Sequence, residues 1–475
     1  MTPDRGALRC MVSALMGLCL TACAVPSARE SLDRTAAAPE LGRGPRVEWR
    51  RDEAADAAVQ SRIAALLAAG VTAESAVSIA YLASPELQLA LERVEVSRAD
   101  LVAATRLPNP VAVVGVREPG GALAAFYPTR TVTVGVLQNV LALLNQPARR
   151  RVARADLERA QLDAADRIVG IAAEVNQAWL ELVAAERVLD LRMQAVEAGR
   201  VSLDTVVVGA ANRKEFGVVD VSNERANLFG LETQVMRGRL DVQTARASLS
   251  RLMGVAGGRD DWKTAGALPV LPDKDPDVAQ LASLALQQRL DLRAARQAVL
   301  VRLRSLSLQK SFRWLGTLEL GVFRESAAGG MSFTGPNAVV ELPVFDQHQA
   351  QLLASDAEYR AARRTLEQRI QSAHGELMTH SAEVAATRAL YEKYRDALLP
   401  NQRQLAARIG GGTQSGATVE RLRLRQSILA SEGEAVGLLR DYWRARGALA
   451  RAAGDWVVAG AGAHQNGSIP VPPRP

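Results

Sequence analysis

Two short segments of the chain alternate strictly between apolar side chains and polar or small ones. In residues 131–136 and 317–322 the apolar side chains share one face of an extended strand: Val132, Val134, Val136, Leu318, Leu320 and Val322. Apolar-out and polar-in alternation at period two is typical of strands in a membrane β-barrel, and two soluble hairpins packed on helices are the alternative. Partner strands are expected over Val111–Arg117 and over residues 335–342.

Most of the remaining chain follows helical spacing. Apolar residues recur in alternating steps of three and four from Ile168 to Leu189 and from Ile370 to Leu398, which is the heptad pattern of coiled coils. An additional four-residue step to Met193 indicates a stutter in the first seam. Ser84 before Pro85 marks the start of the first helix of this set. Helices are predicted at 84–106, 147–207, 218–252, 279–311, 349–408 and 417–453. Sixty helical residues span ~90 Å, more than a globular domain needs.

These elements occur twice in the same order: one medium helix, two strands and two very long helices. Residues 155–168 resemble residues 357–370, and residues 249–254 resemble residues 449–454. A near-constant displacement of this kind predicts two structural copies. We therefore place a first repeat at 81–254, an equatorial linker between the repeats at 255–278, and a second repeat at 279–454. The flanking segments are a predicted lipoprotein signal peptide at 1–22, a predicted lipidated N-terminal segment at 23–80 and a polar tail at 455–475.

The first residues read as a secretory signal. Arg5 and Arg9 precede ten apolar residues, a run too short to span a bilayer. The run ends in Leu-Thr-Ala-Cys, and this lipobox pattern predicts cleavage before Cys23 and acylation of its thiol. A plain secretion signal that happens to contain a cysteine is the alternative. Ala24 after the cysteine favours the outer membrane over the inner one. Since the other two cysteines leave with the signal, no disulfide framework is expected.

Composition narrows the remaining possibilities. The net charge is +7 and the pI about 9.6, but both signs are interspersed without a long basic block, so no nucleic-acid partner is expected. Aromatic residues make up only 4%, as in long helices with thin alanine-rich seams. No 18-residue apolar run follows Cys23, so membrane crossing would require a closed β-barrel. Four strands cannot close a barrel, and strands in lipid therefore require several chains.

The sequence carries no recognisable catalytic or cofactor motif. His374 and His380 lie on different faces of a predicted helix and form no ligand pair, and His380 occupies a seam position where packing is its simplest role. A P-loop, HExxH, Gly-x-Ser-x-Gly and CxxC are all absent from the sequence. We expect neither enzymatic activity nor a cofactor nor a metal site.

The chain resembles the TolC-like outer-membrane efflux proteins, specifically their lipoprotein branch. The resemblance covers about residues 80–454 and rests on the duplicated element order, the lipobox, and short segments that look like the family's. These segments are Leu-Pro-Asn-Pro at 107–110, Leu-Pro-Val-Phe-Asp at 342–346, Arg-Leu-Asp-Leu-Arg-Ala-Ala at 289–295 and the glycine-containing turns at 216–221 and 409–419. The inserted residues 210–215 before the first turn depart from the family pattern.

The resemblance implies a mainly helical fold with a small β part. In such proteins three chains form a twelve-stranded outer-membrane β-barrel that is continuous with a periplasmic helical barrel. A periplasmic adaptor protein would dock on the hairpin tips, and an inner-membrane pump would deliver substrate to a passive duct. The six apolar strand residues named above would face lipid. The adaptor-contacting residues would be Gly217, Asp220, Gly411, Gly416 and Thr418.

Three questions stay open at the level of sequence. A duct for small molecules is the leading hypothesis, while protein secretion of type I and heavy-metal efflux use similar tunnels. A periplasmic coiled-coil spacer without a pore is the alternative from another class, and the strands and the duplication argue against it. A periplasmic enzyme would need a polar constellation that the sequence lacks.

Overall fold

The computed structural model describes residues 47–50, 53–118, 130–212, 215–255, 261–312, 316–328, 330–409 and 415–454, together with residues 27, 30 and 314. The predicted signal peptide, Cys23, Gly411, the C-terminal tail, and Phe126 and Tyr127, which lie between two predicted strands, are outside the described residues. The described chain forms two compact units, one comprising Glu92–Leu162 and Ala294–Gln368 and the other comprising residues 47–91, 163–293 and 369–454. Each unit takes segments from both predicted repeats.

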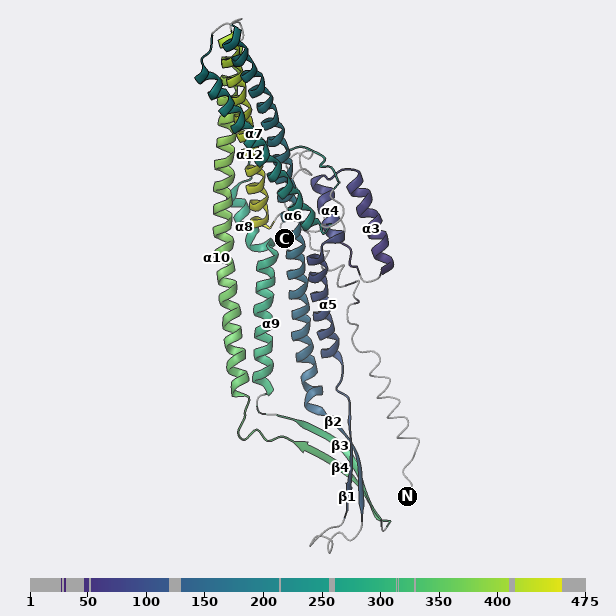
Figure 1. Cartoon of the computed structure of the whole chain (residues 1–475). Coiled ribbons are helices and arrows are strands. Elements are labelled where there is room, and N and C mark those ends of the chain that lie inside the picture. The colour runs from purple at the N-terminus through teal and green to yellow at the C-terminus, as the bar shows by residue number, and fades with distance from the viewer. Residues whose placement is uncertain are drawn as a thin grey trace. The chain divides into compact units, whose positions relative to one another are not determined.

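The first unit contains one antiparallel sheet with the strand order β1-β2-β3-β4 (Figure 1). Its strands are β1 (Val111–Arg117), β2 (Thr131–Asn139), β3 (Leu318–Ala327) and β4 (Ser332–Val340). Hairpin one is therefore joined to hairpin two through β2 and β3, which pair over nine residues from Thr131 opposite Ala327 to Asn139 opposite Glu319. The β1 prediction is confirmed, whereas β3 runs five residues beyond its predicted end.

Helical segments of the first unit come from four helices that contribute to both units. They are α5 (Pro85–Thr105), α6 (Val140–Asn212), α9 (Leu290–Phe312) and α10 (Gln349–Lys393). Strand β2 passes directly into α6, and the Asn139 side chain accepts a hydrogen bond from the Ala142 backbone N–H at 2.7 Å. Polar contacts also link the two repeats inside this unit, since Gln297 Nε2 donates to Glu158 Oε2 at 2.8 Å.

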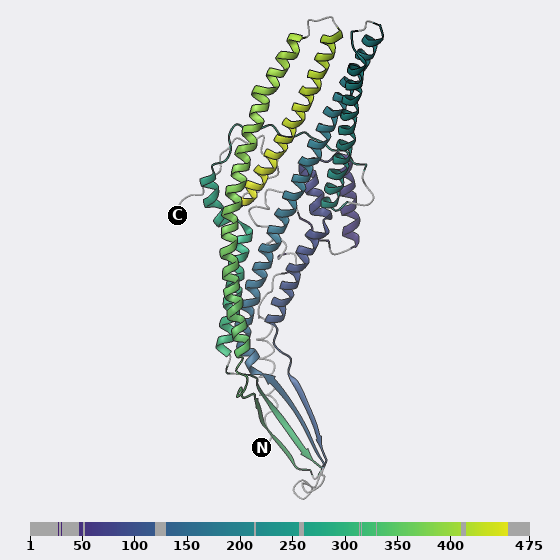
Figure 2. The same cartoon turned by 60° about the vertical axis from the view of Figure 1, so that its left-hand side comes forward.

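The second unit consists of helices and of the linker between the repeats. It contains α3 (Glu53–Ala68), α4 (Ala73–Ala83), α7 (Val218–Met253), α8 (Val278–Gln288), the π-helical turn η2 (Tyr394–Leu398), α11 (Leu399–Ile409) and α12 (Ser415–Ala453). The C-terminal part of α6 and the helix α7 form one antiparallel pair. The C-terminal part of α10, continued by α11, forms another antiparallel pair with α12 (Figure 2).

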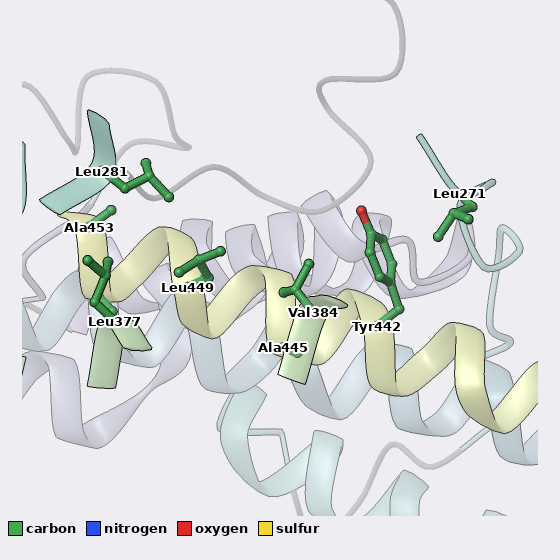
Figure 3. Packing of buried hydrophobic residues seen from close by; sticks show 9 residues of the cluster. Leu271, Leu281, Leu377, Val384, Tyr442, Ala445, Leu449 and Ala453 are labelled. Carbon is green, nitrogen blue, oxygen red and sulfur yellow. The ribbon is translucent and has the colours of Figure 1, made fainter. Parts of the chain in front are cut away.

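The core of the second unit follows the heptad seams. Ile168, Ile171, Val175 and Leu182 of α6 are fully buried, as predicted, but Met193 is largely exposed. In the second repeat, Leu377 and Val384 of α10 pack with Tyr442, Ala445 and Leu449 of α12 and with Leu271 of the linker and Leu281 of α8 (Figure 3). Each buried leucine of this kind stabilises the fold by ~1.5–3 kcal/mol. The ends of the predicted seam, Ile370 and Leu398, lie outside this core.

The linker is fixed to both repeats by buried polar contacts. Trp179 donates from Nε1 to the Val71 carbonyl at 3.0 Å, and Val71 forms a parallel bridge with Thr264. Asp275 accepts hydrogen bonds from Arg388 Nε at 2.6 Å and from the Tyr442 hydroxyl at 2.6 Å. Burial opposes the ionisation of Asp275, but the two hydrogen bonds and the positive charges of Arg388 and Arg446 together outweigh it and hold its pKa below the usual value.

Three predicted helices differ from the structure. Helix α6 begins at Val140, so Pro147, the predicted start, lies inside it. The predicted helix 279–311 is two helices, α8 and α9, separated at Arg289, whose ψ of 121° is not helical. The predicted helix 349–408 contains the π-helical turn η2, a local widening of the hydrogen-bond pattern.

Helix α6 also passes a simple test for a membrane-spanning helix. It contains an 18-residue window with a mean hydropathy of 1.3, contrary to the expectation that no such run follows Cys23. Since 72% of that window is buried inside the structure, the core position of α6 accounts for its apolar composition.

The two repeats share a glycine-capped junction. Helix α7 ends at Gly254 and α12 ends at Gly454, with φ values of 74° and 76°. A Cβ atom on Gly254 would lie 2.6 Å from the Ala83 carbonyl oxygen, and one on Gly454 would lie 2.8 Å from the Arg289 amide nitrogen. Both glycines thus lie against the break that precedes α5 or α9, so the same joint is built twice.

Candidate functional site

One face of the sheet is an exposed apolar surface. The strand register brings Val114, Val134 and Arg324 opposite one another, and Val136 opposite Val322. The predicted residues Val132, Val134, Val136, Leu318, Leu320 and Val322 all lie on this face, together with Ala112, Val114, Val116, Pro336, Ala338 and Val340. Val114 is 71% exposed, Val134 51% and Val322 58%. An uncovered apolar sheet face of this kind is unusual in water and marks an interaction surface.

The opposite face of the sheet is mixed and more polar. Thr131 and Thr133 of β2 lie on it with Glu319 and Glu325 of β3, and Arg117 of β1 pairs with Glu325 at 3.8 Å. Phe333 is in β4 near its start and is 63% exposed. The sheet therefore has one mainly apolar face, on which Arg324 is the charged residue within the described strands, and one more polar face that carries charges of both signs.

Glycine allows β2 and β3 to approach closely. A Cβ on Gly321 would lie 1.9 Å from the Val136 carbonyl oxygen, a distance that no side chain permits. Gly135, on the facing strand, would place a Cβ 3.2 Å from the Val322 carbonyl oxygen. The joint between the two hairpins therefore depends on glycine in β3.

The first helix-pair tip has a short, capped turn. Asp220 accepts a hydrogen bond from the Gly217 backbone N–H at 2.8 Å, and this bond begins α7. Val218 and Val219, in the first turn, are 88% and 71% exposed. In the second repeat Gly416 and Thr418 lie in the first turn of α12. The four described residues predicted to contact an adaptor protein thus lie at the starts of α7 and α12.

A polar clamp that the sequence did not reveal joins α7 to α12. Arg423 of α12 donates from Nε to Glu224 Oε1 of α7 at 2.6 Å, and the Glu224 side chain is only 2% exposed. One turn further, Asn227 Nδ2 donates to Gln426 Oε1 at 3.0 Å. The partners are 199 residues apart in both bonds, so no local pattern indicates them.

Charged residues also gather where α9 begins. Arg289 donates to both carboxylate oxygens of Asp291, at 3.0 and 2.8 Å, and to Glu376 at 2.8 Å. These residues line an open pocket of about 570 Å³ together with Asp166 and Arg451. Burial raises the pKa of Asp291, but the hydrogen bonds and charge of Arg289, the Leu292 backbone N–H and the charge of Arg369 together outweigh it and keep that pKa below the usual value. Burial raises the pKa of Asp166, and Arg451 partly offsets this.

This charged pocket has the features of a structural junction. Arg289 also donates to the Ala452 carbonyl at 3.2 Å, which ties the start of α9 to the end of α12. His380 borders the pocket, and its Nδ1 lies 2.9 Å from Glu383 Oε2. Within the described ranges, no group of three or more His, Cys, Asp or Glu side chains is arranged to hold a metal ion.

The fold of the chain is similar to that of known structures, whereas comparisons of its sequence with protein families and curated proteins give no match. No family model and no curated protein matches the chain. A membrane protein from Pseudomonas aeruginosa matches with a TM-score of 0.68 and 19% identity over 80% of this chain and 92% of that one. The CmeC outer membrane channel of Campylobacter jejuni matches with a TM-score of 0.65 and 13% identity over 88% and 90%. The open state of the MtrE outer membrane channel of Neisseria gonorrhoeae matches with a TM-score of 0.65 and 16% identity over 80% and 88%.

The chain has the fold of the TolC-like outer-membrane channels. It is mainly helical, with four antiparallel strands in two hairpins, as the sequence predicted. Identities of 13–19% establish this fold and nothing finer.

Proposed function

We propose that the protein is the outer-membrane duct of a tripartite efflux system, in which a passive homotrimer exports small molecules. The observation that carries this proposal is the four-stranded sheet, which has one exposed apolar face, one charge-tolerant face and two unpaired edge strands. Lipid suits the first face and an aqueous pore suits the second.

Closing the sheet requires several chains, and the resemblance to the TolC-like proteins implies three. An open sheet edge leaves backbone N–H and C=O groups without partners, and in a bilayer each such group costs several kcal/mol. Four strands from each of three chains make twelve, a number within the range of outer-membrane barrels. The long helices of the three chains would then line the periplasmic tunnel.

The remaining parts of the proposal concern anchoring and partners. Acylation of Cys23 would tether the N-terminus to the outer membrane. The exposed valines at the start of α7, with Gly217 and Asp220, and the first turn of α12, with Gly416 and Thr418, suit contact with a periplasmic adaptor protein; we place Gly411 in the same contact. An inner-membrane pump would supply the energy. Protein secretion and metal efflux remain alternative uses of the same duct.

Two substitutions on opposite faces of β2 test the assignment of the faces. Val136→Arg would place a charge on the apolar face, between Ala112 and Val322, and should cost ~2–4 kcal/mol near the bilayer midplane. Thr133→Arg, the matched control on the other face, should be tolerated in an aqueous lumen. We expect Val136→Arg to reduce the assembled trimer in outer-membrane fractions several-fold. Thr133→Arg should assemble normally and shift the ion selectivity of single channels in planar bilayers towards anions.

The opposite result would contradict the duct. If both variants assemble equally, if the purified protein shows no conductance, and if thiol reagents in water label both faces of β2, the strands do not lie in lipid. A periplasmic spacer without a pore would then be the better interpretation.

A further inference from the structure

The two edge strands of the sheet have complementary backbone edges. Glu341 donates its N–H to the Thr317 carbonyl at 2.9 Å, and Ala327 donates to Met331 at 2.9 Å. Hydrogen-bonded and non-hydrogen-bonded pairs alternate along an antiparallel ladder, so the odd-numbered residues of β4 bond to β3. The even-numbered residues of β4 therefore direct their N–H and C=O groups towards the free edge.

The same reasoning applies to β1. Ala328 donates its N–H to the Arg130 carbonyl at 3.0 Å, which assigns the even-numbered residues of β2 to bonds with β3 and the odd-numbered ones to bonds with β1. The even-numbered residues of β1 thus face its free edge. Even-numbered residues also form the apolar face on both strands, so pairing even with even satisfies the backbone and keeps the apolar face continuous.

The chain already contains one joint between hairpins, namely the β2–β3 pairing. Gly115 of β1 corresponds to Gly321 of β3, since Val-Gly-Val at 114–116 matches Leu-Gly-Val at 320–322, a displacement of 206. Val111 of β1 pairs with Leu137 of β2. The residue 206 positions after Val111 is Thr317, which pairs with Glu341 through the hydrogen bond given above. Leu137 therefore corresponds to Glu341, and β2 corresponds to β4 with a displacement of 204.

We propose that β4 of one copy pairs with β1 of the next copy in the register that the β2–β3 joint prescribes. This proposal rests on the proposed trimeric duct. The internal pair Val136 opposite Val322 becomes Val340 opposite Val116 of the next copy. Leu137 opposite Gly321 becomes Glu341 opposite Gly115, and Gly135 opposite Phe323 becomes Val339 opposite Arg117. Strand β4 would extend to Leu342, whose side chain is 75% exposed in the single chain.

The proposed register also accounts for a glycine at position 115. A Cβ at Gly115 would meet only the Thr133 Cβ, at 3.8 Å, which is an ordinary contact, so nothing in the described chain requires glycine there. Its counterpart Gly321 is required, because a Cβ would collide with the Val136 carbonyl oxygen. In the proposed β4–β1 pairing, the Val340 carbonyl of the neighbouring copy takes the place that the Val136 carbonyl has in the β2–β3 pairing. Gly115 is then the glycine of the second joint.

Pro336 fits the same arrangement. It is an even-numbered residue of β4, so the N–H that proline lacks would point away from β3 and cost no bond within the sheet. In the proposed register it lies beyond the ladder formed by Ala338, Val340 and Leu342. Pro336 therefore removes no hydrogen bond from the proposed β4–β1 ladder.

Disulfide trapping tests the register in the full-length protein. Arg117→Cys is combined in turn with Val339→Cys, Asn337→Cys and Glu341→Cys, three positions on the same face of β4. Directly opposite residues of a non-hydrogen-bonded pair lie ~4.5 Å apart at Cα, within disulfide range, whereas positions two residues away do not. After oxidation in detergent, we expect a ladder up to covalent trimers for the Val339→Cys combination and at least a five-fold lower yield for the other two.

A second measurement uses Gly115→Ala, with Gly335→Ala as the matched control. A Cβ at Gly335 would find only the Phe323 ring edge, at 3.9 Å. We expect Gly115→Ala to lower the temperature at which the trimer dissociates in detergent by several degrees and Gly335→Ala to leave it unchanged. Equal effects of the two variants would contradict the role of Gly115.

The outcomes separate this proposal from the proposed function. Preferred trapping through Asn337→Cys or Glu341→Cys overturns the register and leaves the trimeric duct intact. Trimers by native mass spectrometry without trapping in any combination overturn the β4–β1 pairing. Monomers by native mass spectrometry, without conductance, contradict the duct itself.

Discussion

At the scale of single residues, two glycines determine how each repeat folds back on itself. Gly254 and Gly454 adopt left-handed backbone conformations that end α7 and α12, and both also lie against the backbone of the break that precedes α5 or α9 in the same repeat. In a left-handed position a side chain costs ~1–2 kcal/mol, and the collision with a neighbouring backbone adds a further cost. Only glycine meets both requirements at these positions.

Gly254→Ala is therefore expected to destabilise the helical unit by about 2–4 kcal/mol. Gly230→Ala, in the same helix, is the control, because a Cβ there would have no neighbour within 4 Å. That control should stabilise α7 by about 0.5–1 kcal/mol through helix propensity alone. Thermal unfolding followed by circular dichroism at 222 nm measures both effects. A loss of stability in Gly230→Ala as large as that in Gly254→Ala would refute this account.

At the scale of elements, two polar bonds join α7 to α12 near their tips, one between Arg423 and Glu224 and one between Asn227 and Gln426. Glu224 is almost fully buried, while its partner Arg423 is about half exposed. Removing the arginine would leave a buried carboxylate without its charged partner, which costs ~1–3 kcal/mol or more. The clamp thus makes the pairing of these two helices specific.

A double-mutant cycle on this clamp is expected to be strongly non-additive. Arg423→Ala should destabilise the α7–α12 pair by about 2 kcal/mol, whereas Arg423→Ala combined with Glu224→Leu should recover most of that loss, since no buried charge remains. Amide hydrogen exchange in α7 and α12 reports the local stability. Additive effects of the two substitutions would show that the bond contributes no coupling.

At the scale of the whole molecule, the proposed assembly has two independent attachments to the membrane. The acylated Cys23 would act as a tether, and the closed barrel would act as an anchor. The barrel alone is expected to hold the trimer, since twelve strands bury far more apolar surface in lipid than acyl chains do.

Cys23→Ser should therefore abolish acylation without releasing the protein. Palmitate labelling should disappear, while trimers should still fractionate with the outer membrane, at somewhat lower yield. Cys19→Ser, which lies in the predicted signal peptide, serves as the control and should keep the label. Recovery of the Cys23→Ser variant as a soluble periplasmic monomer would contradict the barrel.

Periodicity predicts the elements well wherever the local sequence determines them. The alternation in 131–136 and 317–322 predicts both central strands, and the apolar spacing from Ile168 onwards predicts the buried seam of α6. The break at Arg289 could not be predicted in this way, because no proline or glycine marks it as Pro85 marks its counterpart. It is held by contacts of Arg289 with Asp291, Glu376 and the end of α12.

The apolar face of the sheet could be read from local sequence, whereas contacts between distant segments could not. Residues that share a face have the same parity along one strand, so the apolar face could be read from the sequence. The extension of β3 through Arg324 and Glu325 could not, because it depends on pairing with β2 and on the ion pair with Arg117. Likewise, Glu224 and Arg423 meet only after the two repeats have folded against each other.

The glycine-capped junction occurs once in each repeat, at Gly254 and at Gly454, and this duplication has a consequence for the assembly of the molecule. A gene encoding one repeat would supply a single hairpin, and six such products would be needed for the twelve strands proposed here. Each association of separate bodies costs ~4–15 kcal/mol in translational and rotational freedom. Fusion of two copies in one reading frame reduces the encounters from five to two. The two copies are not identical at this junction, since Pro85 follows the break in the first repeat and Arg289 lies at the break in the second.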